Sequence, residues 1–263
     1  MNQLERLDFL IDYLKSEQHA SAVEHEQDAT FEGKLADFRA LCNMRPPKSV
    51  SDDYLQVQDA FLQQWNGERQ LTSIDMLEPL APQLYLWQGD ITTLQVDAIV
   101  NAANHELLGC FKPNHECIDN IIHTRAGVQL RLACHKLMEA QGRKEPTGRA
   151  KITDAYNLPA KKVIHTVGPF ITKRGVRALS EQLLASAYTS CLKLADEQKL
   201  QSIAFCCIST GEFNFPNAHA AAIAIETVKT YLQETGSKIA VLFNVFTDED
   251  DQIYQSYLLE KGD

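Results

Sequence analysis

Hydrophobic and polar positions change their spacing near residue 80. Before that point, apolar residues recur every three or four positions, which is typical of one buried helix face. Two such runs are Leu4, Leu7, Leu10, Ile11 and Leu14, and Tyr54, Val57, Phe61, Leu62 and Trp65. Ser51 marks the start of the second helix, and Pro46 and Pro47 separate the two. We therefore expect residues 1–80 to form a helical extension that packs against a main domain.

After residue 80, short runs rich in β-branched and aromatic residues alternate with longer helical patterns. The predicted strands are residues 83–88, 96–103, 150–158, 162–168, 202–209 and 238–246. The predicted helices are residues 118–141, 175–198, 218–234 and 250–260. Several strands are apolar on both faces, as a sheet covered on two sides requires. The order predicts a three-layer α/β/α sandwich with a mixed, mostly parallel sheet over residues 81–263.

Composition and charge narrow the possible partners. The chain has 263 residues and a formal net charge of −10, which disfavours DNA and RNA because nucleic-acid binding depends on clustered Lys and Arg. No run of about 18 apolar residues predicts a membrane-spanning helix. The acidic N-terminal stretch also lacks the pattern of a secretory signal. We expect a soluble, cytoplasmic protein without a nucleic-acid or membrane partner.

The loops that follow the strands hold the candidate binding residues, because ligands of such sheets bind outside the carboxyl ends of the strands. These loops contain "QGDIT", "NAANHELLGC" and "STGEFNFP". In the last, successive backbone N–H groups of Ser209, Thr210 and Gly211 could hold a diphosphate, with Phe213 covering a sugar and Glu212 facing solvent. Simpler roles are also open: a turn cap for Asp90 and an N-terminal helix charge for Asp119.

The segment "GCFKPNHEC", residues 109–117, carries a candidate metal site. Cys110, His115 and Cys117 are soft ligands that favour Zn²⁺, and an i, i+2 pair can converge on one ion only from a loop. Three protein ligands are typical of a catalytic zinc with one open position. Two alternatives remain: a structural zinc with Asp119 or His123 as fourth ligand, and a redox pair of the two cysteines.

Other cysteines and histidines fit a buried role. The seven cysteines show no disulfide framework. Four of them lie among apolar neighbours and are expected to be small core residues: Cys134, Cys191, Cys206 and Cys207. His123 and His165 also fall within apolar patterns, so we expect core histidines whose ring nitrogens are hydrogen bonded.

Five segments resemble, in order and spacing, the macrodomain family of ADP-ribose-binding modules: "GDIT", "VDAIVNAAN", "IDNIIHTRAG", "GPF" and "STGEFNFPNAHAA". The resemblance covers residues 83–250. After "NAAN", the sequence departs from the glycine-rich pattern of the common hydrolase branch and resembles the zinc-dependent macrodomains, which are ADP-ribosyl hydrolases. By this resemblance, Zn²⁺ is bound by Cys110, His115 and Cys117.

The resemblance also implies roles along the bound ligand. Asp90 would accept the adenine amino group beside the Ile91 backbone, whereas Asn104 and Asn101 would contact the distal ribose. Asp119 would orient or deprotonate the attacking water, with Asn104 as its catalytic companion. The full set expected to bind ADP-ribose is Asp90, Ile91, Asn101, Asn104, Cys117, Ile118, Asp119, Ser209, Thr210, Gly211, Glu212 and Phe213.

The implied function is zinc-dependent hydrolysis of the bond between mono-ADP-ribose and a protein side chain, which is a glycosidase reaction that reverses protein ADP-ribosylation. The family further suggests a lipoyl-carrier protein, modified by a sirtuin-like transferase, as the partner. Two other classes stay open. One is a reader module that binds ADP-ribose around a structural zinc, and the other is an interaction protein whose working surface is the helical extension.

Overall fold

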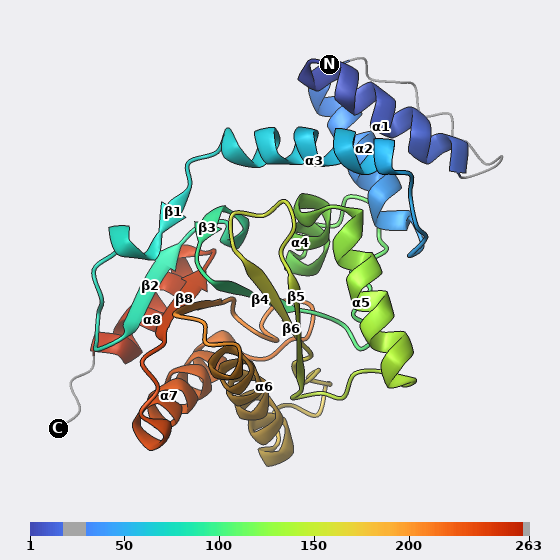
Figure 1. Ribbon diagram of the computed structural model, residues 1–263. Helices are drawn as coiled ribbons and strands as arrows, with labels where there is room; N and C mark the ends of the chain where they lie inside the picture. Colours follow the sequence, from blue (N-terminus) through green and yellow to red (C-terminus); the bar gives the residue numbers. More distant parts are fainter. Residues whose placement is uncertain (18–29, 260–263) are drawn as a thin grey trace.

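A mixed six-stranded sheet forms the centre of the fold in the computed structural model, which describes residues 1–17 and 30–259 (Figure 1). The strands are β2 (Leu84–Gln88), β4 (Ala98–Ala102), β5 (Ala150–Asp154), β6 (Lys162–Thr166), β7 (Ser202–Phe205) and β8 (Ala240–Val245). Their order is β2-β8-β7-β4-β6-β5. Neighbours pair in parallel except β5, which is antiparallel to β6. The predicted mostly parallel sheet is therefore confirmed.

Helices cover both faces of this sheet and complete the predicted three-layer sandwich (Figure 1). They are α4 (Ile118–Ala126), α5 (Val128–Gln141), α6 (Ala178–Glu197), α7 (Asn217–Thr235) and α8 (Asp248–Leu259). Smaller elements are the two-residue strands β1 (Thr72–Ser73) and β3 (Leu94–Gln95) and the 3-10 helices η1 (Ile74–Met76) and η2 (Ile91–Thr93). Most residues of the central strands β4 and β7 are apolar and buried, so packing against both helical layers removes these side chains from water.

One predicted helix is two helices in the structure. The pattern over residues 118–141 predicts a continuous helix, but α4 ends and α5 begins at Gly127. The φ angle of Gly127 is 96°, a conformation that residues with a side chain rarely adopt. A Cβ there would lie 2.6 Å from the side-chain amide of Gln58. The break turns the chain while the apolar pattern continues across it, so periodicity alone missed it.

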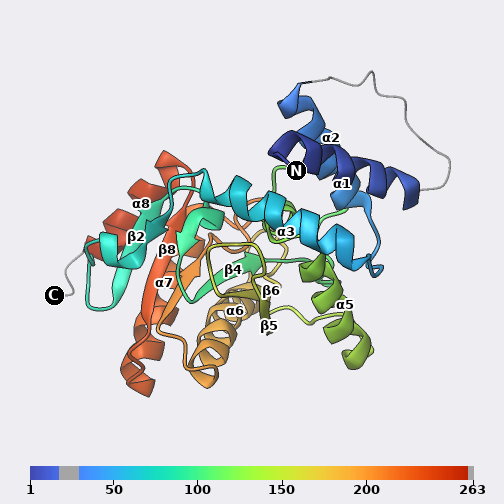
Figure 2. The same cartoon turned by 45° about the horizontal axis from the view of Figure 1, so that its top comes forward.

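Three helices precede the sheet: α1 (Gln3–Glu17), α2 (Phe31–Met44) and α3 (Asp52–Gly67). The α1 and α3 helices match the two predicted runs, and Ser51 caps α3 by accepting a hydrogen bond from the Tyr54 N–H at 3.2 Å. Figures 1 and 2 show α1 and α2 side by side, with α3 running across toward the sheet. Their shared apolar cluster includes Phe38, Phe61 and, from α5, Val128. The boundary at residue 80 stays a prediction.

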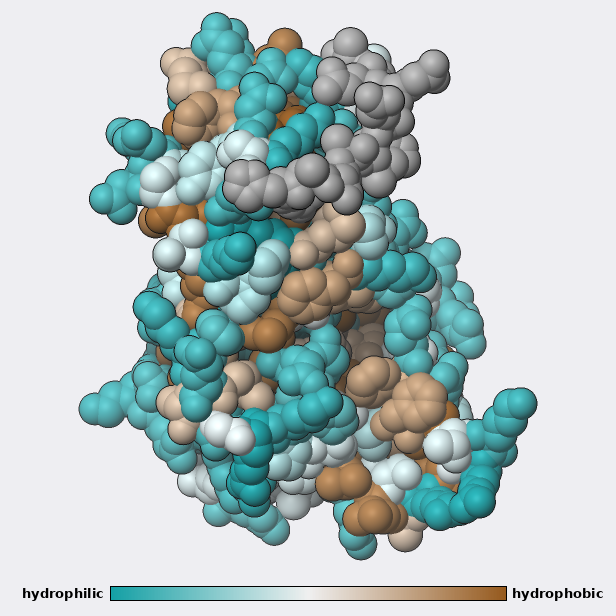
Figure 3. Space-filling view, turned by 90° about the vertical axis from the view of Figure 1, so that its right-hand side faces the viewer, coloured by the Kyte–Doolittle hydropathy of each residue, from teal (hydrophilic) through white to brown (hydrophobic). Residues whose placement is uncertain are grey.

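The surface carries polar residues over most of the face on which these helices meet α5 (Figure 3). Hydrophobic residues lie between the polar ones in small groups on this face. None of the helices within residues 1–17 and 30–259 is long and apolar enough to cross a membrane.

Candidate active site

A cleft of about 1190 Å³ lies at the carboxyl ends of the central strands. Its wall is built from the loops after β2, β4, β7 and β8, as expected for a parallel sheet. The volume is sufficient for a dinucleotide-sized ligand. All the predicted site residues line it except Asn101. Segments that are more than 100 residues apart in the sequence therefore meet in one cleft.

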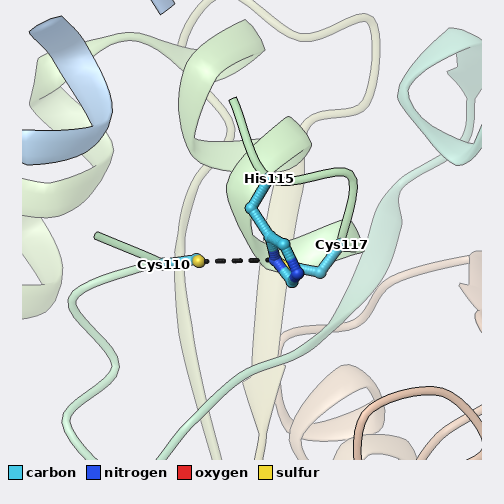
Figure 4. Close-up of side chains that lie close together, drawn as sticks. All are labelled: Cys110, His115 and Cys117. Atoms are coloured by element: carbon cyan, nitrogen blue, oxygen red, sulfur yellow. Dashed lines mark hydrogen bonds between the residues drawn. The ribbon is translucent and has the colours of Figure 1, made fainter. Parts of the chain in front are cut away.

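The three predicted metal ligands lie together at one end of this cleft. Possible ligand atoms of Cys110, His115 and Cys117 are within 4.8 Å of one another. In Figure 4 the three labelled side chains converge, and the dashed line joins Cys110 Sγ to His115 Nδ1 at 3.6 Å. The loop reverses direction at Asn114, whose φ is 51°, and ends where Cys117 begins α4. This turn lies between Cys110 and His115, so it brings the first ligand back toward the other two.

The chemistry of the three side chains fits a divalent cation. Without one, burial and the neighbouring Cys110 together raise the pKa of the Cys117 thiol to about 12. A bound cation would favour the thiolate instead, and two thiolates with one imidazole are a preferred ligand set for Zn²⁺. In the described residues, neither Asp119 nor His123 joins this group as a fourth ligand. The donor set therefore fits a three-ligand zinc site.

Glu212 brings the predicted phosphate loop next to the predicted metal ligands. Its side chain is 73% exposed, in line with the expectation that it faces solvent, but its Oε1 atom lies 3.5 Å from His115 Nε2. A carboxylate at Nε2 favours a proton on that nitrogen and leaves Nδ1 free to bind a metal. His115 Nδ1 is the atom that faces Cys110.

Asp119 lies in the first turn of α4, on the cleft wall. Burial raises the pKa of its carboxyl group to about 6, although a hydrogen bond from Asn101 acts in the opposite direction. The Asn101 Nδ2 atom donates to Asp119 Oδ1 at 2.8 Å, and Asn104 Nδ2 lies 3.4 Å from Oδ2. The carboxylate is therefore held between two amides.

The expected contact between Asn101 and the distal ribose is wrong for this structure. Asn101 is fully buried in β4 and does not line the cleft. Its side chain lies behind Asp119, so it can orient the carboxylate but cannot reach a ligand. Asn104, three residues later, leaves the strand and does line the cleft. Asn101 is therefore held inward within β4, whereas Asn104 lies beyond the end of the strand and reaches the cleft.

The two buried histidines differ. His165 is hydrogen bonded as expected, with Nδ1 3.2 Å from Asn101 Nδ2 and Nε2 3.0 Å from Thr153 Oγ1. Neither ring nitrogen of His123 has a hydrogen-bond partner among the described residues, so the expectation fails there. Burial lowers the pKa of both rings, that of His165 to about 3. The His123 ring packs against Gly109, where a Cβ would lie 2.9 Å from it.

The predicted phosphate loop is a compact turn between β7 and α7. The φ of Ser209 is 70°, and its carbonyl accepts from the Phe215 N–H at 2.9 Å. A Cβ at Gly211 would meet no atom of the described residues within 4 Å, so the space above this glycine is open to a ligand. Phe213 packs edge-to-face with Phe170, with ring centroids 5.8 Å apart. Together they form an aromatic border beside the loop.

At the other end of the cleft, Asp90 caps η2 and also lines the wall. Its Oδ1 atom accepts from the Thr92 N–H at 2.9 Å, and its Oδ2 accepts from Arg69 at 2.7 Å. Sequence reasoning missed the residues at the end of β8, Asn244 and Phe246, which line this end. The position of β8 between β2 and β7 is the signal that would have found them, because its carboxyl end opens into the same cleft.

Comparison with known proteins agrees with this fold and cleft. The model of the Macro domain family matches residues 100–224. A Staphylococcus aureus protein named protein-ADP-ribose hydrolase is 53% identical over 95% of this chain and 94% of its own length. A protein of the same name from Treponema medium is 47% identical over 98% of this chain and 100% of its own. The chain therefore belongs to the macrodomain family.

A solved structure gives the same result at the level of the fold. The Trypanosoma brucei macrodomain in complex with ADP-ribose superimposes with a TM-score of 0.65 at 29% identity. The match covers 82% of this chain and 94% of that structure.

Proposed function

We propose that this protein is a zinc-dependent hydrolase that removes mono-ADP-ribose from modified protein side chains. The relatives named protein-ADP-ribose hydrolase, at 47% and 53% identity over nearly the whole chain, support the hydrolase activity. One observation carries the zinc-dependent part. The ligand atoms of Cys110, His115 and Cys117 lie within 4.8 Å of one another on the wall that also carries Asp119.

The proposed ligand lies along the cleft from Asp90 to the metal loop, residues 110–117. Adenine binds beside Asp90 and Ile91, where the exposed ring of Phe246 borders the cleft. The diphosphate binds the backbone N–H groups of residues 209–213, for which the open space at Gly211 is suited. The distal ribose then reaches Asn104 and the metal loop. With the ligand in this direction, the scissile bond lies beside the Asp119 carboxylate and the metal ligands.

The chain's own groups perform three tasks in this reaction. Asn104, at the cleft wall, contacts a ribose hydroxyl through its side-chain amide, and Asn101 holds the Asp119 carboxylate in place from behind. Asp119 accepts a proton from the attacking water, and a pKa raised to about 6 makes it a stronger base than an exposed aspartate. The hydroxyl of the water replaces the protein side chain on ADP-ribose, and the leaving side chain takes up the proton that Asp119 accepted. Zn²⁺ bound by the loop would supply Lewis-acid chemistry at the ribose end.

The partner suggested by family resemblance, a lipoyl-carrier protein modified by a sirtuin-like transferase, is part of the proposal. It defines the first protein substrate to assay, beside a generic protein that carries mono-ADP-ribose on an acidic side chain.

Substitution of one metal ligand tests the zinc-dependent part. Cys117→Ala is expected to lose both bound zinc and turnover, whereas Cys191→Ala, at a buried cysteine of α6 outside the cleft, keeps both. Zinc content and ADP-ribose release are measured on the same preparations. Full turnover by Cys117→Ala would contradict the proposal. Bound zinc and ADP-ribose affinity without turnover in the unmodified protein would favour a reader module.

A further inference from the structure

The metal loop has little regular structure of its own to fix its shape. Residues 110–117 form no helix or strand, and most of their side chains are exposed. One internal turn is closed by the His115 N–H, which donates to the Lys112 carbonyl at 3.3 Å. A loop with so few internal bonds would sample several conformations unless neighbouring elements held it. The contacts from those neighbours therefore decide how well three ligands are arranged.

Two of these contacts come from α2, in the N-terminal extension. The Asn43 Oδ1 atom accepts from the Asn114 N–H at 3.0 Å, and Arg39 Nη2 donates to the His115 carbonyl at 3.3 Å. Asn43 is 1% exposed, and its Nδ2 donates to Thr124 Oγ1 at 3.1 Å. Both ends of this amide are thus fixed. The contacts reach the backbone of one predicted metal ligand and of the residue before it.

Asn120, in the first turn of α4, extends the same network. Its Nδ2 donates to the Lys112 carbonyl at 3.0 Å, and its Oδ1 lies 3.4 Å from Arg39 Nη2. Asn120 is fully buried. The turn of the loop is therefore held on one side by α4 and on the other by α2.

Arg131 of α5 fastens the end of α2 to the start of the loop. The last carbonyls of a helix lack partners within that helix. Arg131 Nη1 donates to the carbonyls of Cys42 and Asn43 in the last turn of α2 and to that of its C-cap residue, Arg45. Its Nε donates to the Leu108 carbonyl at 2.7 Å, two residues before the first predicted ligand. Movement of α2 is therefore coupled to the loop through one guanidinium group.

We propose that Arg39 and Asn43 of α2 are positioning residues that hold the metal loop in its ligand-binding conformation. This inference rests on the proposed zinc site. It assigns the extension a part in the active site itself, because a loop that is already arranged binds an ion without a further cost of ordering. Groups that support metal ligands in this way typically change metal affinity by about 10 to 100-fold when removed.

The test uses the full chain with two changes, Arg39→Met and Asn43→Ala, together. Zinc affinity is measured by competition with a chromogenic chelator, and ADP affinity is measured by calorimetry. We expect zinc to bind about tenfold or more weakly, with ADP affinity unchanged because ADP lacks the distal ribose. The Co²⁺-loaded protein should also show a weaker thiolate-to-metal absorption band. Replacing Arg39→Met by Arg39→Lys in this double variant keeps a donor for the His115 carbonyl. This change should restore part of the zinc affinity.

Gln63→Ala is the matched control, because Gln63 also crosses from the extension to the main domain but contacts Asn157 rather than the loop. It should keep zinc affinity at the wild-type value. Equal zinc affinity in the double variant and the wild type would overturn the inference. Joint loss of zinc and ADP affinity would also overturn it, since that indicates general unfolding. A wild type that binds no zinc refutes the proposed metal site, and the inference with it.

Discussion

Replacement of Asp119 by asparagine separates its chemical role from its structural one. The amide has the shape of the carboxylate, so its oxygen can still accept from Asn101 Nδ2, now at 2.8 Å. Its nitrogen would face Asn104 Nδ2, now 3.4 Å from the second carboxylate oxygen. Asn104 cannot turn to relieve this contact easily, because its Oδ1 accepts from the Glu106 N–H and its Nδ2 donates to the Gly109 carbonyl.

The expected effect on folding is small. One long hydrogen bond is lost, at a cost of about 1 kcal/mol. Against this, burial disfavours the ionised carboxylate, as its raised pKa of about 6 shows. A carboxyl group whose pKa rises on folding costs stability above that pKa and ceases to cost it as the pH falls toward the ordinary value near 4. The free energy of unfolding of Asp119→Asn should therefore lie within about 1 kcal/mol of the wild-type value at neutral pH.

The expected effect on catalysis is large. Loss of a general base slows a reaction by about 10² to 10⁴-fold, which corresponds to about 3 to 5 kcal/mol in the barrier. The assay is single-turnover release of ADP-ribose from a mono-ADP-ribosylated protein, with zinc content and ADP-ribose affinity measured in parallel. Asp154→Asn, at an exposed carboxylate paired with Lys162, is the matched control and should retain the wild-type rate. An unchanged rate in zinc-loaded Asp119→Asn would refute the assigned role.

Three further predictions concern glycine, adenine and pH. Gly109→Ala should lower the free energy of unfolding by about 1 to 3 kcal/mol, because φ is 81° and the new Cβ meets the His123 ring; an unchanged urea midpoint would argue against this. Asp90→Asn should weaken ADP binding about tenfold by calorimetry, and equal affinity would exclude the adenine contact. Burial raises the pKa of Asp97, but the Lys161 hydrogen bond and backbone donors outweigh it and the net pKa is lowered. Its stabilisation is therefore present above about pH 4 and lost as the pH falls through the lowered pKa, so the urea midpoints of wild type and Asp97→Asn should converge in acid.

The sheet and its helices could be predicted because their sequence patterns are local. A strand buried on both faces needs a continuous apolar run, and residues 98–100 of β4 and 203–205 of β7 form such runs. The cleft followed from the rule that ligands bind at the carboxyl ends of parallel strands. The α2 helix was missed although Thr30 stands at its start as an N-cap, because its apolar stripe is weaker than those of α1 and α3.

The supporting contacts of the site could not be predicted because they join distant parts of the chain. Asn43 and Asn114 are 71 residues apart, and no local pattern relates them. The inward position of Asn101 depends on the phase of β4 in the sheet, which a motif of two nearby asparagines does not reveal. Sequence therefore indicated which residue types lie near the ligand, whereas the structure shows which of them touch the cleft.

Release of ADP-ribose before and after removal of metal tests the central claim most directly. The substrate is a protein with mono-ADP-ribose on an acidic side chain, and zinc is quantified on the same preparation. We predict about one zinc per chain, turnover that falls in proportion to zinc removed by a chelator, and recovery when zinc is added back. Undiminished turnover by zinc-free protein would contradict the account.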